Sequence, residues 1–365
     1  MSALSRWLFV VTAACAALAP AAETPAPGRA GVFLSEARLN TLRLRIASKV
    51  QPTYEAWLKL KAAADKHLKA EPHAPKEWYV PGYYNDAEGH RKAKEGLQDD
   101  ANTAYELALC YRMTGDEKYA AAAARLIRAW ATTPEKLSRK DDSTLSFSYH
   151  FPALILAADL LRPSRSFPAA EQEEFKAFVR EKALPLNTMG SSNNWGNWGL
   201  VLVLAGAAYL GDGALFEKGV ARWKQFIEKQ IAEDGRLHEE VNRNGGRSGV
   251  WYSHFSLMPQ TLAAEIARVN GVDLYEYRAP NGRTMRQAFE LLAGWTRSPA
   301  KFPYWKGDAK ELHGSDYASY FEILNARWRN ADAAAFLESR RPLTASHCAP
   351  YLTFTHGGLL NDDGK

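Results

Sequence analysis

Helical periodicity is the feature that most constrains what this chain can fold into. From Asp99 to Met113, apolar residues recur at spacings of three and four; Gly115 then stops the helix and Asp116 can cap the next one. A glycine closely followed by an aspartate recurs at residues 210–212 and 270–273, each time between an apolar periodic segment and another helical one. The pattern predicts a chain built from pairs of antiparallel helices.

Further segments have the same period and strand signals are almost absent, so the sequence predicts an all-α fold. Gly115, Gly211 and Gly271 are unevenly spaced, which disfavours a tetratricopeptide array with its period of about 34 residues. Helix pairs that close around an axis form an α/α toroid, an incomplete (α/α)6 or (α/α)7 barrel, with loops lining a cleft. The other expected helices are 36–70, 117–131, 149–161, 169–183, 200–210, 214–232, 283–295, 317–327 and 331–340.

The sequence predicts one large domain between two short terminal segments. We expect the toroid over residues 31–341, because no linker rich in Pro, Ser or Gly interrupts it. Residues 342–365 are expected to be a C-terminal tail, in which the β-type run Tyr351 to Thr355 can form a short strand or simply cross the surface.

The N-terminus predicts export. Residues 1–22 combine a basic start at Arg6, an apolar stretch and small residues near Ala22, which is the pattern of a cleaved secretory signal peptide. A lipoprotein reading of Cys15 is the less favoured alternative, and no later stretch is apolar enough to span a membrane. We therefore expect a periplasmic or secreted protein, in which Cys110 and Cys348 can pair or remain free.

Composition points to a sugar ligand and away from nucleic acid. The 365 residues carry a net charge of +5, with Lys and Arg scattered among acids and no block of one sign. The 11 Trp, 16 Tyr and 15 Phe side chains can stack on sugar rings, and cations can meet the carboxylates of uronic acids. An acidic polysaccharide or oligosaccharide is the expected partner; the oligomeric state is left open.

The densest polar segment stands before the apolar helix at residue 200. It contains Asn193, Asn194, Trp195 and Trp198. Backbone N–H groups at a helix start favour an anion, and Asn side chains donate hydrogen bonds without carrying charge. These residues can grip a uronate carboxylate, or Asn193 and Asn194 can merely cap the helix while both tryptophans lie in the core.

A second segment, residues 234–255, delivers cations, a phenol and an imidazole through a Gly-rich turn. Guanidinium groups at Arg243 and Arg247 favour a phenolate at Tyr252, so Arg plus Tyr is a plausible pair for proton transfer. The alternatives are an ion pair of Arg243 with Glu239 or Glu240, and core positions for Tyr252 and His254.

Together these segments resemble the alginate lyase superfamily, most closely polysaccharide lyase families 5 and 38. The resemblance rests on Asn193-Asn194-Trp195, the 234–243 segment, the helix start at Tyr252 and the run 79–84, and it extends from about residue 31 to 356. It implies an α/α toroid and β-elimination of uronic-acid polysaccharides, with Asn194 neutralising the carboxylate. Family 5 has a proton-transferring His where this chain has Trp195, which leaves Tyr252, His150 or His254 as the base.

Two aromatic segments flank these residues. Tyr79, Tyr83 and Tyr84 stand on a loop broken by Pro and Gly, and they can stack on sugars or pack. Tyr320 and Phe321, on the expected helix 317–327, are better explained as core residues.

The sequence contains no dinucleotide, phosphate-loop or zinc-protease motif, so we expect a reaction without cofactor or metal. The leading hypothesis is an exported lyase in which Asn194 and Arg243 neutralise a uronate carboxylate and Tyr252 transfers protons. A glycoside hydrolase using Glu239 with Glu240, or Asp316 with Glu322, is the alternative enzyme. A non-catalytic periplasmic scaffold that binds glycans is the alternative outside enzymes.

Overall fold

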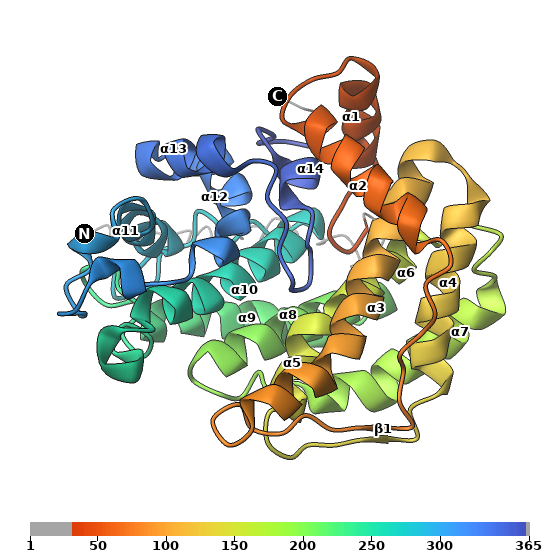
Figure 1. The fold of residues 1–365 in the computed structure, drawn as a ribbon, viewed down its shortest axis with the longest axis horizontal. Coiled ribbons are helices and arrows are strands. Elements are labelled where there is room, and N and C mark those ends of the chain that lie inside the picture. Colours follow the sequence, from red (N-terminus) through yellow and green to blue (C-terminus); the bar gives the residue numbers. More distant parts are fainter. Residues whose placement is uncertain (1–30, 363–365) are drawn as a thin grey trace, which may run out of the picture.

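The computed structural model describes residues 31–362, and there the chain is mostly helical with very little strand (Figure 1). The signal peptide expected at 1–22 and Cys15 lie outside the described residues. The α-helices are α1 (Glu36–Ala47), α2 (Thr53–His67), α3 (Ala87–Thr114), α4 (Glu117–Thr132), α5 (Ser143–His150), α6 (Pro152–Leu160), α7 (Ala169–Phe178), α8 (Asn194–Leu210), α9 (Gly213–Gln230), α10 (Gly249–Val269), α11 (Met285–Arg297), α12 (Phe321–Trp328), α13 (Ala331–Arg340) and α14 (Leu352–His356).

Short turns of other helix types complete the described elements. They are the π-helical η1 (Val179–Ala183) and the 3₁₀ turns η2 (Leu184–Leu186), η3 (Arg243–Gly246), η4 (Pro299–Lys301), η5 (Ala309–Glu311) and η6 (Ser315–Tyr320). Two-residue strands β1 (Glu77–Trp78) and β2 (Lys136–Leu137) pair in parallel, and β1 leads into the loop of Tyr79, Tyr83 and Tyr84.

The predicted helix pairs are confirmed at their turns. Gly115 ends α3 with φ 72°, a left-handed conformation that glycine adopts without a Cβ penalty, and the Asp116 side chain caps α4. Gly211 ends α8 in the same way before Asp212 caps α9. After Gly271 the outcome differs, because an irregular segment runs to Thr284 and only then does α11 begin.

Burial separates the helices into an inner and an outer layer, as an α/α toroid requires. Helices α6, α8 and α10 are buried along nearly their whole lengths, whereas α4, α9 and α11 bury one face. The inner helix α8 packs against α10, α9, α5 and α6. Because α8 begins at Asn194, this packing fixes the amide-rich segment at one end of the inner layer.

Several predicted boundaries were wrong, chiefly at prolines. The expected helix 36–70 is two helices separated at Pro52, and 149–161 is divided between α5 and α6, which begins at Pro152, because proline favours a helix start. The expected helix 317–327 begins as a 3₁₀ turn, and α3 starts twelve residues before the predicted Asp99.

The C-terminal segment is not a strand. Residues 352–356 form α14, in which Thr355 and Gly357 donate backbone hydrogen bonds to carbonyls four residues earlier. The helix is buried against α2 and α12, so tertiary packing outweighs the β-type composition of the run. Residues 342–362, expected as a tail, pack into the same core as the toroid.

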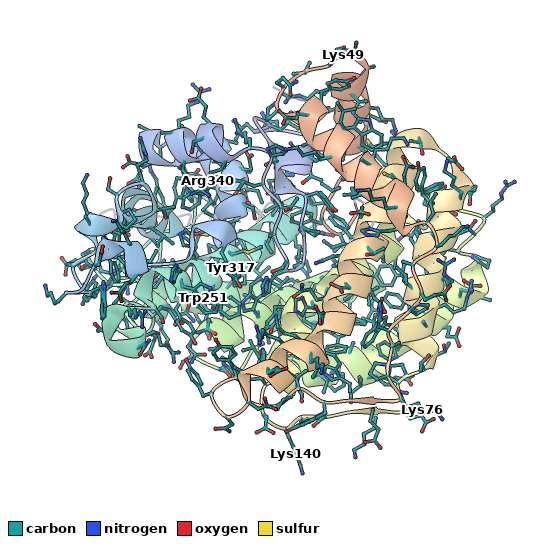
Figure 2. The ribbon with its side chains drawn as sticks, in the orientation of Figure 1. Lys49, Lys76, Lys140, Trp251, Tyr317 and Arg340 are labelled. Atoms are coloured by element: carbon teal, nitrogen blue, oxygen red, sulfur yellow. The ribbon has the colours of Figure 1, made fainter. Side chains whose placement is uncertain are left out.

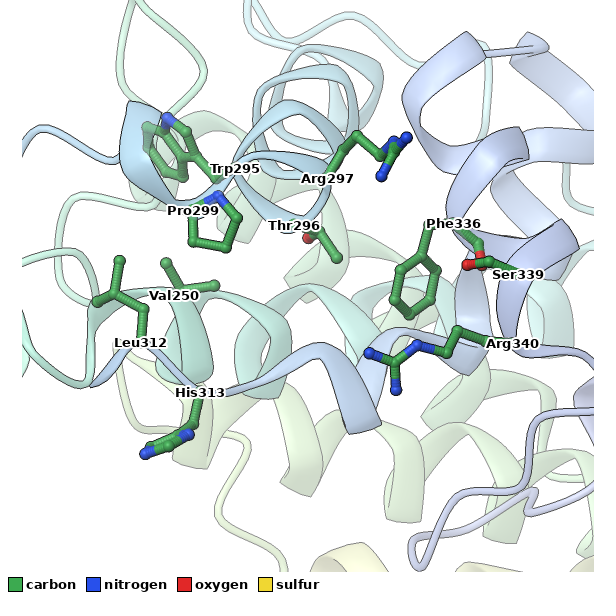
Figure 3. Close-up of a pocket in the computed structure, with 10 residues that line it drawn as sticks. All are labelled: Val250, Trp295, Thr296, Arg297, Pro299, Leu312, His313, Phe336, Ser339 and Arg340. Carbon is green, nitrogen blue, oxygen red and sulfur yellow. The ribbon is translucent and has the colours of Figure 1, made fainter. Parts of the chain in front are cut away.

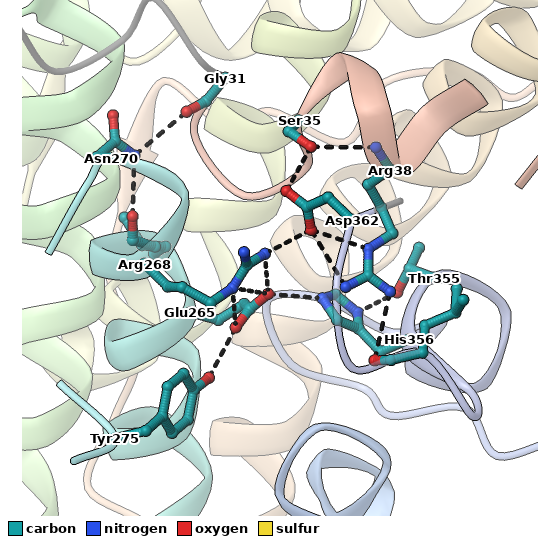
Figure 4. A network of polar contacts seen from close by, with 12 residues as sticks. Gly31, Ser35, Arg38, Glu265, Arg268, Asn270, Tyr275, Thr355, His356 and Asp362 are labelled. Atoms are coloured by element: carbon teal, nitrogen blue, oxygen red, sulfur yellow. Dashed lines mark hydrogen bonds and ion pairs between the residues drawn. The ribbon is translucent and has the colours of Figure 1, made fainter. Parts of the chain in front are cut away.

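A buried ionic network ties the two ends of the described chain to α10 (Figure 4). Asp362 accepts hydrogen bonds from Arg38 on α1 and Arg268 on α10, at 3.2 and 2.7 Å. Arg268 also pairs with Glu265, which contacts His356 at 3.2 Å. The network therefore joins α1, α10 and α14 where the ring closes.

Two further features bear on the sequence predictions. Cys110 and Cys348 are buried free thiols that do not form a disulfide. Within residues 31–362, no helix is long and apolar enough to cross a membrane.

Candidate active site

The start of α8 places an amide against a buried carboxylate. Asn193 caps the helix by accepting a hydrogen bond from the backbone of Trp195 at 3.1 Å. Asn194 is 1% exposed; its backbone N–H donates to Glu240 Oε1 at 3.0 Å, and its side-chain Nδ2 lies 3.0 and 3.1 Å from Oε1 and Oε2. Because both oxygens belong to one carboxylate, one N–H can serve both and leave the other for a ligand.

Arg243 lies on the other side of the same carboxylate. It begins the 3₁₀ turn η3, and its Nε donates to Glu240 Oε2 at 3.3 Å. The turn ends at Gly246 with φ 93°, where an added Cβ would stand 1.9 Å from the carbonyl oxygen of Tyr304. Only glycine fits there, so the turn that carries Arg243 is held close against the 304 segment.

Glu240 thus organises both residues that were expected to neutralise a substrate carboxylate. Burial raises the pKa of Glu240 above its usual value, and the hydrogen bonds from Asn194 and the charge of Arg243 oppose that rise. The ion-pair alternative for Arg243 is therefore present in the structure, and it coexists with a partly exposed guanidinium.

Tyr252 lies directly beside this group, on the first turns of α10. The Arg243 guanidinium lies 4.9 Å from the centre of the Tyr252 ring, and the two hydroxyls of Tyr252 and Tyr84 are 2.7 Å apart. Burial and then the bond to Tyr84 raise the pKa of Tyr252, whereas Arg243 lowers it. Arg243 thus acts in the expected direction, but burial outweighs its effect on the Tyr252 pKa. Tyr252 is held as a neutral phenol that can donate a proton.

Exposed tyrosines border the site. Tyr84 is 81% exposed, and Tyr83 and Tyr79 are about half exposed. Asp141 and Asp142 hold this loop by accepting hydrogen bonds from the Tyr79 hydroxyl and the Tyr83 backbone. Three polar rings are therefore presented to solvent on a loop that reaches Tyr252 through Tyr84.

The remaining predicted binding residues differ in access. Arg247 is exposed and its Nε pairs with Glu311 at 3.1 Å. Trp195 is partly buried, whereas Trp198 is fully buried and packs on Phe255, which matches the core alternative for that indole.

Comparison with known proteins decides the family. A family model described as alginate lyase matches residues 45–302, well over half of the chain. The chain belongs to the alginate lyase family. Among curated relatives, a polysaccharide lyase of Stenotrophomonas maltophilia (strain K279a) is 32% identical over 168 residues, 45% of this chain and 48% of the relative. An alginate lyase of Cobetia marina is 29% identical over 183 residues, 48% of this chain and 44% of the relative. The chain thus spans about half the length of the curated relatives it matches.

Solved alginate lyases share the fold. Alginate lyase A1-III of Sphingomonas species A1 has a TM-score of 0.71 at 19% identity, over 90% of this chain and 98% of that one. An alginate lyase of Bacteroides ovatus has a TM-score of 0.69 at 18% identity, over 90% and 99%. The expected α/α toroid is confirmed.

His254 is fully buried, and both of its ring nitrogens form hydrogen bonds within the fold. Its Nε2 lies 2.9 Å from Thr296 Oγ1, which already donates its proton to the Leu292 carbonyl, so Nε2 carries the hydrogen. Nδ1 then accepts from the Tyr320 hydroxyl at 3.0 Å. Burial lowers the pKa of His254 to about 3. Both nitrogens are occupied, which fits the core alternative.

His150 lies in the centre of an aromatic cluster. It is fully buried, with its ring stacked on His347 at 5.1 Å between centroids. Neither ring nitrogen has a partner at full hydrogen-bond geometry, although the Ser346 backbone gives a weaker contact. Burial, reinforced by His347 and Lys94, holds the pKa of His150 well below its usual range. His150 is thus a neutral imidazole, and its lowered pKa makes it a weak base.

The structure reveals two residues near His150 that sequence reasoning missed. His347 contacts Tyr149, Trp198 and Phe255 from the 341–350 segment. Lys94 lies over the Tyr149 ring at 5.7 Å, and burial lowers its pKa. Lys94 falls in the polar first half of α3, and His347 in the segment expected as a tail; neither stands in a motif.

Glu322 and Glu240, two carboxylates of the hydrolase alternative, are bound by neighbouring side chains. Glu322 is buried and bound by Arg341 at 2.8 and 2.6 Å, and also by Thr353. Glu239 is exposed beside His238, while Glu240 is buried beneath Asn194. Within residues 31–362, no three His, Cys, Asp or Glu side chains are grouped as metal ligands would be.

Proposed function

We propose that this chain is an exported polysaccharide lyase that cleaves a uronic-acid polymer by β-elimination. The observation that carries the proposal is the convergence of Asn194, Arg243 and Tyr252 around Glu240, beside the exposed ring of Tyr84. Family membership supports the reaction class, and the aromatic loop supports a sugar ligand.

The first requirement of the reaction is a more acidic C5–H bond. The C5 proton of a uronate becomes easier to remove when donors stabilise the negative charge that spreads onto the adjacent carboxylate. Arg243 supplies a cation whose guanidinium is only partly committed to Glu240, and Asn194 supplies a neutral N–H. Glu240 fixes both donors before substrate arrives, so little reorganisation is needed when charge develops.

The second requirement is a proton for the leaving O4 oxygen. Tyr252 is a protonated phenol in the resting site, so it can donate to that oxygen as the C4–O4 bond breaks. The electron pair from the C5–H bond forms the C4–C5 double bond, and the leaving sugar departs with the proton from Tyr252.

The third requirement is a base for the C5 proton. Tyr252 can fill this role if its proton moves to the Tyr84 oxygen, 2.7 Å away, while the exposed Tyr84 releases its own proton to solvent. The Tyr252 phenolate then takes the C5 proton and returns that same proton to the leaving O4 oxygen. His150 is the alternative base because no full hydrogen bond occupies its ring nitrogens. His254 is less suited, because both of its nitrogens are occupied.

The substrate class follows from the same side chains, and the location from the N-terminus. The Arg243 guanidinium and the Asn194 amide are donors that suit the carboxylate of a sugar. The exposed tyrosines of the 79–84 loop offer rings on which that sugar can stack. Export to the periplasm or beyond rests on the signal-like residues 1–22.

The proposal is tested by incubating the purified protein with alginate, glucuronan and a glycosaminoglycan. A lyase generates a conjugated, unsaturated uronate that absorbs in the ultraviolet together with each new reducing end. Reducing ends without that absorbance mean hydrolysis, and binding with neither means a glycan-binding scaffold. Either of the last two results would overturn the proposal.

A further inference from the structure

A cavity of about 280 Å³ lies on the far side of α10 from Tyr252, and the proposed reaction does not use it (Figure 3). Val250 lines this cavity, two residues before Tyr252 on the same helix. Side chains two positions apart on a helix project about 200° from one another, so the cavity and the Tyr252 hydroxyl face different directions. The cavity is therefore a separate feature of the molecule.

Two cations without acidic partners face this cavity. Arg297 ends α11 and Arg340 ends α13, and Figure 3 shows them on either side of Phe336. None of the ten lining residues is acidic, and among residues 31–362 no ion pair or hydrogen bond engages either guanidinium. The last turn of a helix favours a cation, which explains how both arginines are tolerated without a carboxylate. Their planar donor forks remain available for an anion.

The rest of the wall suits a sugar ring better than a bare anion. Phe336 and Trp295 are buried rings that give the cavity an apolar side. Ser339 donates its hydroxyl proton to the Phe336 carbonyl at 2.9 Å, so its oxygen can accept a hydrogen bond from a ligand hydroxyl. His313 adds an exposed ring at the mouth. The volume is at the small end of ligand pockets, as one sugar residue requires.

We propose that this cavity binds a carboxylated sugar residue, with Arg297 and Arg340 holding the carboxylate and Phe336 and Ser339 contacting the ring. It is a second glycan site of the same ligand class as the active site, and in that respect it rests on the proposed function. An inorganic anion would need only the two arginines, whereas a carboxylated sugar uses the cations, the apolar wall and the hydroxyl acceptor together.

Equilibrium binding of a uronate trisaccharide, measured by calorimetry, tests the proposal apart from turnover. A Tyr252→Phe protein keeps the ligand intact, and two sites per chain are expected. Adding R297Q and R340Q together should leave one site, and each single change should weaken the second site about tenfold. R165Q with R180Q removes the same charge beside α7, across the ring in Figure 1, and should leave both sites intact.

The ligand series decides the chemistry. A carboxyl-reduced trisaccharide should lose the second site, and inorganic phosphate should bind there more weakly than the uronate. One site in the parent protein, unchanged binding in R297Q/R340Q, or equal binding of the reduced sugar or of phosphate would overturn the inference. If R297Q/R340Q removes the second site while the wild-type protein makes no unsaturated product, the proposed function fails and this site stands.

Discussion

Replacing Tyr252 by Phe separates catalysis from stability, because it removes one hydroxyl and keeps the ring. The ring stays under the Arg243 guanidinium, so the contact at 4.9 Å is retained. What is lost is the 2.7 Å hydrogen bond to Tyr84, whose side chain is 81% exposed and can bond to water instead. The free energy of unfolding should therefore fall by about 1 kcal/mol or less.

The effect on turnover should be much larger. Loss of a general acid or base slows a reaction by about a hundredfold to ten-thousandfold, or about 3 to 5 kcal/mol in the barrier. Initial rates of ultraviolet absorbance, a thermal melt and oligosaccharide binding on the same preparation give the comparison, with binding expected within a few fold. Tyr84→Phe is the matched control, since it removes the same hydrogen bond but keeps the Tyr252 hydroxyl, and it should cost less activity. Near-normal elimination by Tyr252→Phe would refute the assignment and move proton transfer to a histidine, to be decided by the His150→Ala and His254→Ala variants.

Three further changes test the surrounding groups. Asn194→Ala should lower turnover by about a hundredfold or more while the protein still folds, as judged by circular dichroism and kcat; an early melt with normal turnover of the folded fraction would mean that Asn194 only supports the helix start. Arg243→Gln should raise the pKa of Tyr252 further, because Arg243 lowers it, so the pH at which activity falls through loss of the protonated phenol should move upward; an unchanged pH–rate profile would contradict this coupling. Burial alone would raise the pKa of Glu265, but His356 and Arg268 hold that pKa well below its usual range. The Glu265 carboxylate should therefore stabilise the fold fully above its unfolded pKa of about 4.3, and this stabilisation should be lost as the pH falls toward the pKa of Glu265 in the folded protein. Glu265→Gln should therefore flatten the acid limb of the urea-unfolding stability curve, and an unaltered limb would show that the network in Figure 4 does not contribute.

The helix pairs were predictable because their turns are local. Gly115 and Gly211 both adopt the left-handed conformation that the sequence suggested, and the flanking aspartates cap the next helices. The α14 segment was not predictable in this way, since Tyr-Leu-Thr-Phe-Thr has β-type composition and only its burial against other helices makes it helical.

The candidate site was predictable in its members but not in its contacts. Asn194, Arg243 and Tyr252 each stand in a recognisable segment, yet the carboxylate that joins the first two lies 46 residues from Asn194. The Tyr84–Tyr252 contact spans 168 residues, and no local pattern encodes it. Burial likewise decided the pKa of Tyr252, and burial is a property of the fold rather than of the neighbouring arginines in sequence.

The mass of the product chains tests the central claim most directly. When a uronate polymer is cut in water enriched in heavy oxygen, β-elimination places no solvent oxygen in the new ends and leaves the unsaturated fragment one water lighter than a hydrolysis product. We expect such light, unlabelled unsaturated ends from the wild-type protein, with their yield reduced by about a hundredfold or more in Tyr252→Phe. Products in which every fragment has a saturated non-reducing end, with none one water lighter, would contradict this expectation.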